Sequence, residues 1–237
     1  MNAPEPSVRT RSMQLRRARI LTAARQLIAD GGFDALNLRA LAAAAAVTVP
    51  TIYNLIGNKE ELVVALFDEA LSEVERRVGT HRGASPLEQA EAVVTESIAV
   101  FAADEAFYRA AFVALEYLDQ NSAHHDAAQQ LFAWGERMLL AGCAACQAAG
   151  LLRGQIPTAL LSAQILRCYR SSSRAWAYGQ VTIDEFRATA LDDLHVCLAA
   201  DAVETFHAIL LRALGRRATT AARTSPIRTA RTGENAS

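Results

Sequence analysis

The chain has 237 residues, of which 51% are hydrophobic, 21% charged and 6% aromatic, with 12 glycines and 6 prolines. This composition excludes a disordered chain, which has fewer apolar residues, and a collagen-like chain, which has far more glycine and proline. The length is enough to bury a core without disulfides or a structural metal. Alanine, the strongest helix former, makes up about a fifth of the chain and predicts an all-α protein.

The net charge of −1 conceals an uneven distribution. Residues 1–57 contain seven arginines against three acidic residues, and residues 216–237 contain five arginines against one glutamate. Residues 58–215 contain 12 basic and 21 acidic residues. This asymmetry favours a basic part that binds a polyanion and an acidic body with another role.

The first residues are polar and contain no apolar block, so no secretory signal is expected. The longest apolar run, Met138–Leu152, is shorter than the roughly 20 residues that a membrane-spanning helix needs. We therefore expect a cytoplasmic protein without a membrane partner, in which the four cysteines are reduced thiols.

Apolar residues at helical spacing predict helices along the whole chain. In chain order, these cover 19–30, 38–45, a short stretch between Thr48 and Gly57, 59–78, 86–102, 104–117, 122–149, 158–178 and 183–214. Asn37 and Thr48 are expected N-caps, and Gly31-Gly32 is expected to end the first helix.

Further end signals occur in the body. Asn121 or Ser122 is the expected N-cap of the helix that Gly150 ends, and Thr182-x-x-Glu185 is an expected capping box. Asp201-x-x-Glu204 is a second candidate box, which would break the last helix. Residues 1–12 and 216–237 show no apolar periodicity and are expected to be a disordered arm and a disordered basic tail.

Residues 38–57 have the pattern of a helix-turn-helix, in which two short helices are joined by a tight turn. Leu41, Ala42, Val47 and Ile52 would form its apolar wedge. Hydroxyls and a helix N-terminus suit phosphate oxygens, and a carboxamide such as that of Asn54 can read a base edge. The arm around Arg9–Arg19 would either reach DNA or remain a solvated tail.

This region resembles the TetR (tetracycline repressor) family of bacterial transcriptional regulators. The resemblance extends from Arg19 to about Leu71 and rests on Ile20-Leu21-x-Ala-Ala, Gly31-Gly32-Phe33, Leu41-Ala42, Ala45-Ala46-Val47-Thr48, Thr51-Ile52-Tyr53-Asn54 and Gly57-Asn58-Lys59-Glu60-Glu61-Leu62. It implies that Tyr53 and Lys59 hold phosphates and that the start of the recognition helix reads bases. Ala46 and Pro50 stand where the family usually has glycine, so Ala46 would adopt an unfavourable backbone conformation at a cost of about 1 kcal/mol.

The candidate DNA-binding residues are therefore Asn37, Arg39, Thr48, Val49, Pro50, Thr51, Tyr53, Asn54 and Lys59. The resemblance assigns residues 13–58 to this unit and residues 59–215 to a helical ligand-binding and dimerisation domain. It implies that helices 158–178 and 183–214 pair with a second copy, with Leu194 and Leu210 as candidate interface positions.

The body contains most of the aromatic residues, which suit an apolar or amphipathic ligand although core packing is the alternative for each of them. The candidate ligand-binding residues are Phe101, Phe112, Tyr117, Trp134, Met138, Tyr169, Arg170 and Trp176. Arg167, Arg170 and Arg174 share one stripe of their helix. Such a stripe either holds an anionic group or pairs with acids such as Asp192, Asp193 or Asp201.

Two motifs have chemical alternatives. Cys143-Ala-Ala-Cys146 lies in mid-helix without a strand before it, which favours two buried small residues over a redox pair or half of a zinc site. His124-His125-Asp126 is expected to be a surface segment, since the sequence places no further metal ligands near it. We expect no catalytic residues, no metal and no cofactor.

These observations predict a three-helix DNA-binding unit followed by a larger helical domain. The expected function is a homodimeric, ligand-responsive transcriptional regulator, a repressor that a small-molecule effector releases from a palindromic double-stranded DNA operator. The alternative is a helical small-molecule-binding protein or enzyme that retains the N-terminal fold. We do not expect the protein to be an enzyme.

Overall fold

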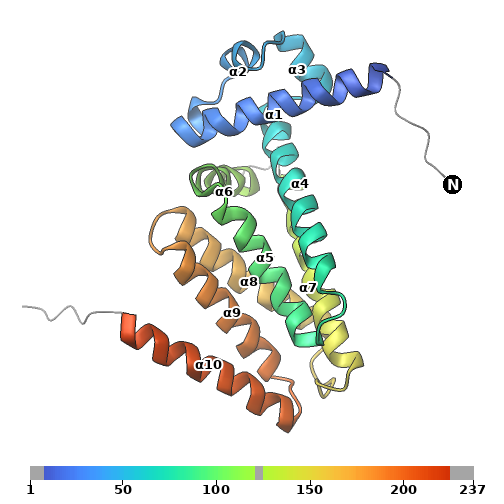
Figure 1. Cartoon of the computed structure of the whole chain (residues 1–237), viewed down its shortest axis with the longest axis vertical. Coiled ribbons are helices and arrows are strands. Elements are labelled where there is room, and N and C mark those ends of the chain that lie inside the picture. The colour runs from blue at the N-terminus through green and yellow to red at the C-terminus, as the bar shows by residue number, and fades with distance from the viewer. Residues whose placement is uncertain (1–7, 121–124, 225–237) are drawn as a thin grey trace, which may run out of the picture.

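The computed structural model describes residues 8–120 and 125–224, which form ten α-helices and one short 3-10 helix. The helices are α1 (Val8–Ala35), α2 (Leu38–Ala44), α3 (Val49–Leu55), α4 (Lys59–Val78), η1 (Gly79–His81), α5 (Pro86–Ala102), α6 (Glu105–Gln120), α7 (His125–Ala148), α8 (Thr158–Ala177), α9 (Ile183–Ala199) and α10 (Glu204–Thr224). Figure 1 shows α1–α3 as a small unit above a larger bundle, with α4 running from one into the other. The all-α prediction is confirmed.

Within residues 8–120 and 125–224, no single helix is long and apolar enough to cross a membrane, although α2 and α3 pass that test as a pair bent by 95°.

Both ends of the chain contain more helix than expected. α1 begins at Val8, so the prediction of a disordered arm is wrong for residues 8–12, and α10 continues to Thr224, so the predicted tail is helical over 216–224. Neither stretch has an apolar stripe. Residues 216–224 consist mostly of arginine and alanine, whose helix propensity extends α10, whereas residues 8–12 continue α1 as its first turn. Residues 1–7 and 225–237 lie outside the described residues.

The predicted helix ends are largely confirmed. Asn37 Oδ1 accepts the Ala40 N–H at 2.8 Å, and Thr48 caps α3. Reciprocal capping boxes begin α4 at Asn58 and α9 at Thr182. The backbone of α1 leaves helical geometry at Gly32, where φ is 73°, and Gly150 after α7 has φ 70°. The expected cap at Asn121 or Ser122 lies outside the described residues.

The expected break in the last helix occurs, but Asp201 does not cap α10. Its carboxylate is 1% exposed and accepts backbone N–H groups of Gly154 at 2.8 Å, Gln155 at 3.0 Å and Ile156 at 3.3 Å. Asp201 therefore joins the α7–α8 connection to the turn between α9 and α10. The spacing Asp201-x-x-Glu204 predicts a helix cap, but the Asp201 carboxylate instead binds backbone groups that are distant in the sequence.

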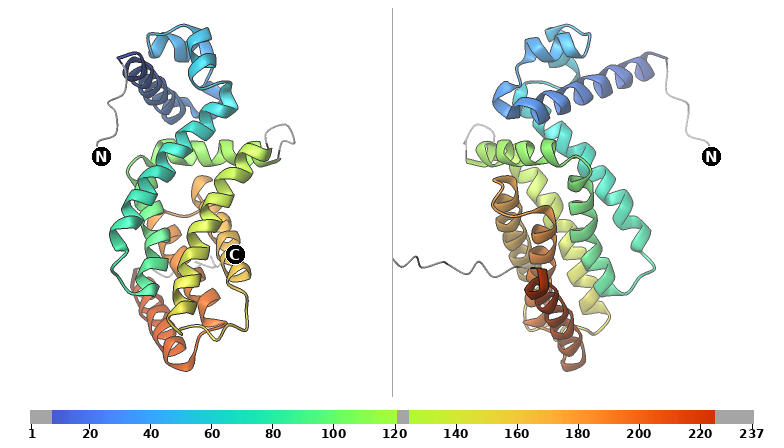
Figure 2. Two further views of the ribbon diagram at one scale, coloured as in Figure 1. Left: turned by 90° about the vertical axis from the view of Figure 1, so that its right-hand side faces the viewer. Right: turned by 60° about the vertical axis from the view of Figure 1, so that its left-hand side comes forward.

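The small unit and the bundle share α4 and meet at a second contact between α1 and α6, which lies across the upper end of the bundle (Figure 1, Figure 2). The Arg25 guanidinium of α1 lies 4.4 Å from the centre of the Phe107 ring, and its Nη1 donates to the Tyr108 hydroxyl at 3.3 Å. It also pairs with Glu69 of α4 at 3.6 Å and with Asp104 at 3.7 Å. Arg25 thus fixes how the two parts sit against each other.

Candidate functional site

The first candidate site is the bent pair α2–α3. The two helices differ in direction by 95°, with the buried side chains of Leu41 and Ile52 between them. The small buried residues Ala42 and Ala45 allow α2 to approach α3 closely. This arrangement leaves the outer face of α3 uncovered by the rest of the described chain.

Most of the predicted DNA-binding residues lie on this open face. Tyr53 is 54% exposed, and the other exposed members of the set are Asn37, Arg39, Thr48, Pro50 and Asn54. Thr51 is half-buried, and its hydroxyl lies 2.8 Å from that of Thr48. Val49 is the exception, because it packs against the core and contributes little to the open surface.

The turn between α2 and α3 contains the unfavourable backbone conformation that was predicted for Ala46. Ala46 has φ 50° and is the one non-glycine residue with positive φ in the described part of the chain. Its neighbour Val47 donates a backbone hydrogen bond to the Ala42 carbonyl at 2.9 Å, which closes the helix end as a left-handed cap does. The chain therefore bears left-handed strain at this turn.

We expect Ala46→Gly to raise the free energy of unfolding by about 0.5–1 kcal/mol. Left-handed strain costs an L-residue about 1–2 kcal/mol, and the greater entropy of glycine in the unfolded chain offsets about 0.4–1 kcal/mol of the relief. Urea denaturation measures the change. Ala43→Gly, within α2, is the control and should lower stability by about 1 kcal/mol. A loss of stability in Ala46→Gly as well would show that the turn is unstrained.

Lys59, at the first position of α4, lies beside the DNA-binding unit rather than free in solvent. Its Nζ is 4.0 Å from the centre of the Phe33 ring, so the ammonium is held by a cation–π contact. Phe33 directly follows the Gly31-Gly32 break in α1, and its ring makes this contact with Lys59. The charge of Lys59 is thereby positioned at the N-terminus of α4, where an anion is favoured.

A basic groove adjoins α3, and part of its α1 side, Arg9 and Ser12, falls within the predicted disordered arm 1–12. Arg9, Ser12, Met13 and Arg16 of α1 line it together with Thr51, Asn54 and Leu55 of α3. The α1 residues follow helical spacing and therefore occupy one face. Arg17 instead lines a separate groove beside the acidic residues Asp68, Glu69 and Glu73 of α4.

The second candidate site is a cavity of about 90 Å³ lined by residues of α4–α8. Its wall is almost entirely apolar and includes Phe67, Val94, Phe101, Phe112 and Leu139. Among the predicted ligand-binding residues, the wall contains Phe101, Phe112, Trp134, Tyr169 and Arg170.

The other three predicted ligand-binding residues do not line this cavity. Tyr117 is 63% exposed on α6, and Met138 lines a surface groove beside Glu75. Trp176 is fully buried behind the cavity wall, and its indole N–H donates to Glu105 Oε1 at 3.0 Å. Helical periodicity identifies a buried face but does not show which buried residues border a cavity.

The polar groups of the cavity wall already have partners. The Tyr169 hydroxyl lies 2.8 Å from Ser97 Oγ, and burial raises the pKa of Tyr169, so the phenol stays protonated. The Arg170 guanidinium lies 3.6 Å from the centre of the Phe132 ring, and Ser173 Oγ donates to the Arg170 carbonyl at 3.0 Å. The interior therefore suits the apolar part of a ligand.

The arginine stripe of α8 is divided among three environments. Arg170 lines the cavity, Arg174 pairs with Glu116 of α6 at 3.3 Å, and Arg167 hydrogen-bonds to Gln164. The predicted partners Asp192, Asp193 and Asp201 are not the ones observed for Arg174. The spacing of the three arginines predicts that they share one face of α8, but it does not predict which residues each of them contacts.

Cys143 and Cys146 are both fully buried. Burial raises the pKa of Cys143 to about 12 and that of Cys146 to about 11, which disfavours the reactive thiolate. Within residues 8–120 and 125–224, no three His, Cys, Asp or Glu side chains are grouped so that they could hold a metal ion. The side chains of His124, His125 and Asp126 lie outside the described residues.

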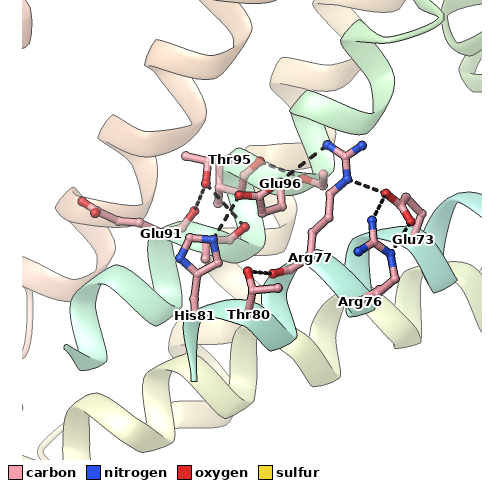
Figure 3. Close-up of polar contacts among 11 residues, drawn as sticks. Glu73, Arg76, Arg77, Thr80, His81, Glu91, Thr95 and Glu96 are labelled. Atoms are coloured by element: carbon pink, nitrogen blue, oxygen red, sulfur yellow. Dashed lines mark hydrogen bonds and ion pairs between the residues drawn. The ribbon is translucent and has the colours of Figure 1, made fainter. Parts of the chain in front are cut away.

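A polar network fixes the lower end of α4 to α5 (Figure 3). Glu73 accepts hydrogen bonds from Arg76 and Arg77, each at 2.7 Å, and these bonds lower the pKa of Glu73 to about 2. Glu96 of α5 lies 4.0 Å from the Arg77 guanidinium and 3.1 Å from His81 Nε2. α4 is thus attached to the bundle at its C-terminal end, while its N-terminal end follows the DNA-binding unit.

Comparison with known proteins agrees with this arrangement. Residues 20–66 match the family model described as "Bacterial regulatory proteins, tetR family". The chain is 27% identical over 119 residues to the HTH-type transcriptional repressor KstR of Rhodococcus jostii, which covers 50% of this chain and 56% of that protein. The chain therefore spans little more than half the length of this curated relative.

Two solved structures show the same fold. SmeT, the repressor of a Stenotrophomonas maltophilia multidrug efflux pump, has a TM-score of 0.62 at 19% identity over 79% of this chain and 91% of that chain. The transcriptional regulator FadR of Bacillus subtilis, solved with stearoyl-CoA, has a TM-score of 0.62 at 20% identity over 75% of this chain and 96% of that chain.

Proposed function

The chain belongs to the tetR family of bacterial regulatory proteins, and from this premise we propose that it is a transcriptional repressor that a small apolar or amphipathic molecule releases from DNA. The observation on which the proposal depends is the open face of α3. Tyr53, Asn54 and Pro50 are exposed there beside the basic groove of α1. Exposed hydroxyls and an amide on a short helix suit phosphates and base edges.

We place the effector in the cavity lined by α4–α8. The structure of FadR with stearoyl-CoA supports this placement, since that fold accommodates a ligand with a long apolar chain. The enzyme alternative lacks comparable support, because the comparisons point to regulators and the buried thiols are poor nucleophiles. Apolar burial of the effector provides its affinity.

Binding in the cavity reaches the DNA-binding unit through two contacts. Phe101 of the cavity wall lies 5.0 Å, ring centre to ring centre, from Tyr108, and Tyr108 contacts Arg25 of α1. The cavity also borders α4 directly at Phe67 and Leu71. An effector that spreads α4 and α6 therefore shifts the DNA-binding unit, and in a dimer this changes the separation of the two recognition helices.

Fluorescence anisotropy with a duplex taken from the DNA upstream of the protein's own gene tests the proposal. We expect binding that weakens steeply with salt, because phosphate contacts release counterions. Operator-sized DNA should also lower the affinity of any effector by the factor by which that effector lowers DNA affinity, since coupling is reciprocal. Salt-insensitive or absent binding would contradict the proposal.

We expect Arg9→Ala/Arg16→Ala to weaken binding to all DNA sequences and to flatten the plot of log K against log salt by about 0.9 for each phosphate that the variant no longer neutralises. These two arginines line the groove beside Thr51 and Asn54. Arg11→Ala/Arg17→Ala is the matched control, with the same charge removed from other faces of α1. Equal changes in both double variants would show a general effect of net charge instead of a contact by this face.

A further inference from the structure

The apolar cavity adjoins a second space on the protein surface. A groove on the surface between α4 and α7 shares Leu71, Leu131 and Trp134 with the cavity, so these three side chains border both spaces. The cavity volume is about 90 Å³, less than an elongated ligand requires, and the adjoining groove adds about 430 Å³. A ligand longer than the cavity can therefore extend past these three side chains into the groove.

Trp134 lies between the cavity and the groove and makes one polar contact. Its indole N–H donates to Glu75 Oε1 at 2.6 Å, and Glu75 is a residue of α4. If the indole swings outward, this hydrogen bond breaks and the exposed Glu75 carboxylate can accept from water or from a ligand. The same movement joins the cavity to the groove.

The groove differs from the cavity in polarity and charge. Asp68, Ser72 and Glu75 of α4 line one side, and Arg137 of α7 lies on the other. The two carboxylates give the α4 side a negative charge and accept hydrogen bonds but cannot donate them. A group placed beside Glu75 is therefore favoured if it donates a hydrogen bond and disfavoured if it is anionic.

We propose that cavity and groove form one site for an elongated amphiphile whose apolar chain enters the cavity and whose ammonium or hydroxyl group replaces the Trp134 indole as the donor to Glu75. This inference rests on the proposed function and assigns the chemical class of its effector. It also makes α4, which leads to the DNA-binding unit, a direct contact of the polar group.

Three probes with the same ten-carbon chain test the assignment: decylamine, decanol and decanoate. We expect decylamine and decanol to bind at least about tenfold more tightly than decanoate, because the two carboxylates of α4 repel an anion in the groove. Calorimetric titration gives the affinities, and a raised thermal midpoint distinguishes binding from detergent-like unfolding. Decanoate binding as tightly as the other two would overturn the proposal and favour a site centred on an arginine.

Two variants test the roles of Glu75 and Trp134. Glu75→Gln should weaken decylamine severalfold and leave decanol within about twofold, since the amide oxygen still accepts. Glu136→Gln, which makes the same change on α7 outside both spaces, should leave both affinities unchanged. Trp134→Phe should speed decylamine association in stopped flow, followed by the fluorescence of the remaining Trp176, which packs on the cavity-lining rings of Phe101 and Phe112. Unchanged association would overturn the gating role.

DNA binding is measured first without any amphiphile, so that failure of the DNA-binding role can be distinguished from failure of the effector assignment. Wild-type protein that binds operator DNA but not decylamine or decanol defeats this inference and leaves the DNA-binding role intact. Protein that binds the amphiphiles but no DNA defeats the proposed function instead. Release of DNA by decylamine and decanol, and not by decanoate, is the result expected if both hold.

Discussion

Asp201→Ala is expected to lower the free energy of unfolding by about 2–4 kcal/mol, because the substitution removes a buried acceptor from three backbone N–H groups. These groups belong to Gly154, Gln155 and Ile156, which lie about 46 positions earlier in the chain. The neighbouring backbone bonds Arg153 N–H to the Asp201 carbonyl, 2.7 Å, and Val203 N–H to the Leu151 carbonyl, 3.0 Å, join the same two segments. Urea denaturation measures the change in stability.

Asp184→Ala is the control for this substitution. Asp184 is an exposed carboxylate in the first turn of α9 that pairs with Arg187 at 2.9 Å, so its removal should cost less than about 1 kcal/mol. Asp201→Asn should cost less than Asp201→Ala, because the amide oxygen can still accept from Gln155 and Ile156, whereas the amide nitrogen that replaces Oδ2 cannot accept from Gly154. Equal stability of Asp201→Ala and Asp184→Ala would show that the buried carboxylate is dispensable.

Local signals in the sequence were sufficient for most helix boundaries and for the helix-turn-helix. Asn37, Thr48 and Asn58 act within three residues of their own position, so a cap can be recognised without knowledge of the fold. The strained conformation of Ala46 was predictable for the same reason, since the turn dictates it.

Contacts between distant segments were not predictable from these patterns. Asp201 has the spacing of a capping box, yet its partners lie between α7 and α8. Trp176 and Phe101 are similar in chemistry, and their ring centres lie 6.2 Å apart, but only Phe101 borders the cavity. Which side of a buried helix meets empty space depends on the packing of five helices, and residue type does not encode it.

The interface positions Leu194 and Leu210 show the same limit. Both leucines are fully buried within the protomer, so a charge at either would enter its own core and unfold it instead of separating two copies. The structure offers other apolar residues of α8 and α9 for the proposed dimer. Leu160 is 54% exposed in the first turn of α8, and Val196 is 57% exposed in the last turn of α9.

Leu160→Glu/Val196→Glu is expected to convert the proposed dimer into monomers and to weaken binding to a two-half-site operator by at least about 100-fold. α8 and α9 form an antiparallel pair joined by a short loop, so the start of α8 and the end of α9 lie at the same end (Figure 1). The two exposed side chains therefore lie at one end of the pair, where we expect them to take part in a twofold contact. A monomer presents one recognition helix and lacks the gain in affinity from two linked contacts.

Analytical ultracentrifugation reports the oligomeric state of this variant, and anisotropy reports its affinity for one and for two half-sites. Tyr117→Glu is the matched control, since Tyr117 is 63% exposed and belongs to α6 instead of α8 or α9. It should remain dimeric and bind DNA as the wild type does. The stability of the double variant should change by less than about 1 kcal/mol, because both positions are already in solvent in the protomer. If Leu160→Glu/Val196→Glu remains a dimer, the interface lies on another face. A monomer that binds two half-sites as tightly as the wild type would show that DNA recognition does not need the twofold arrangement.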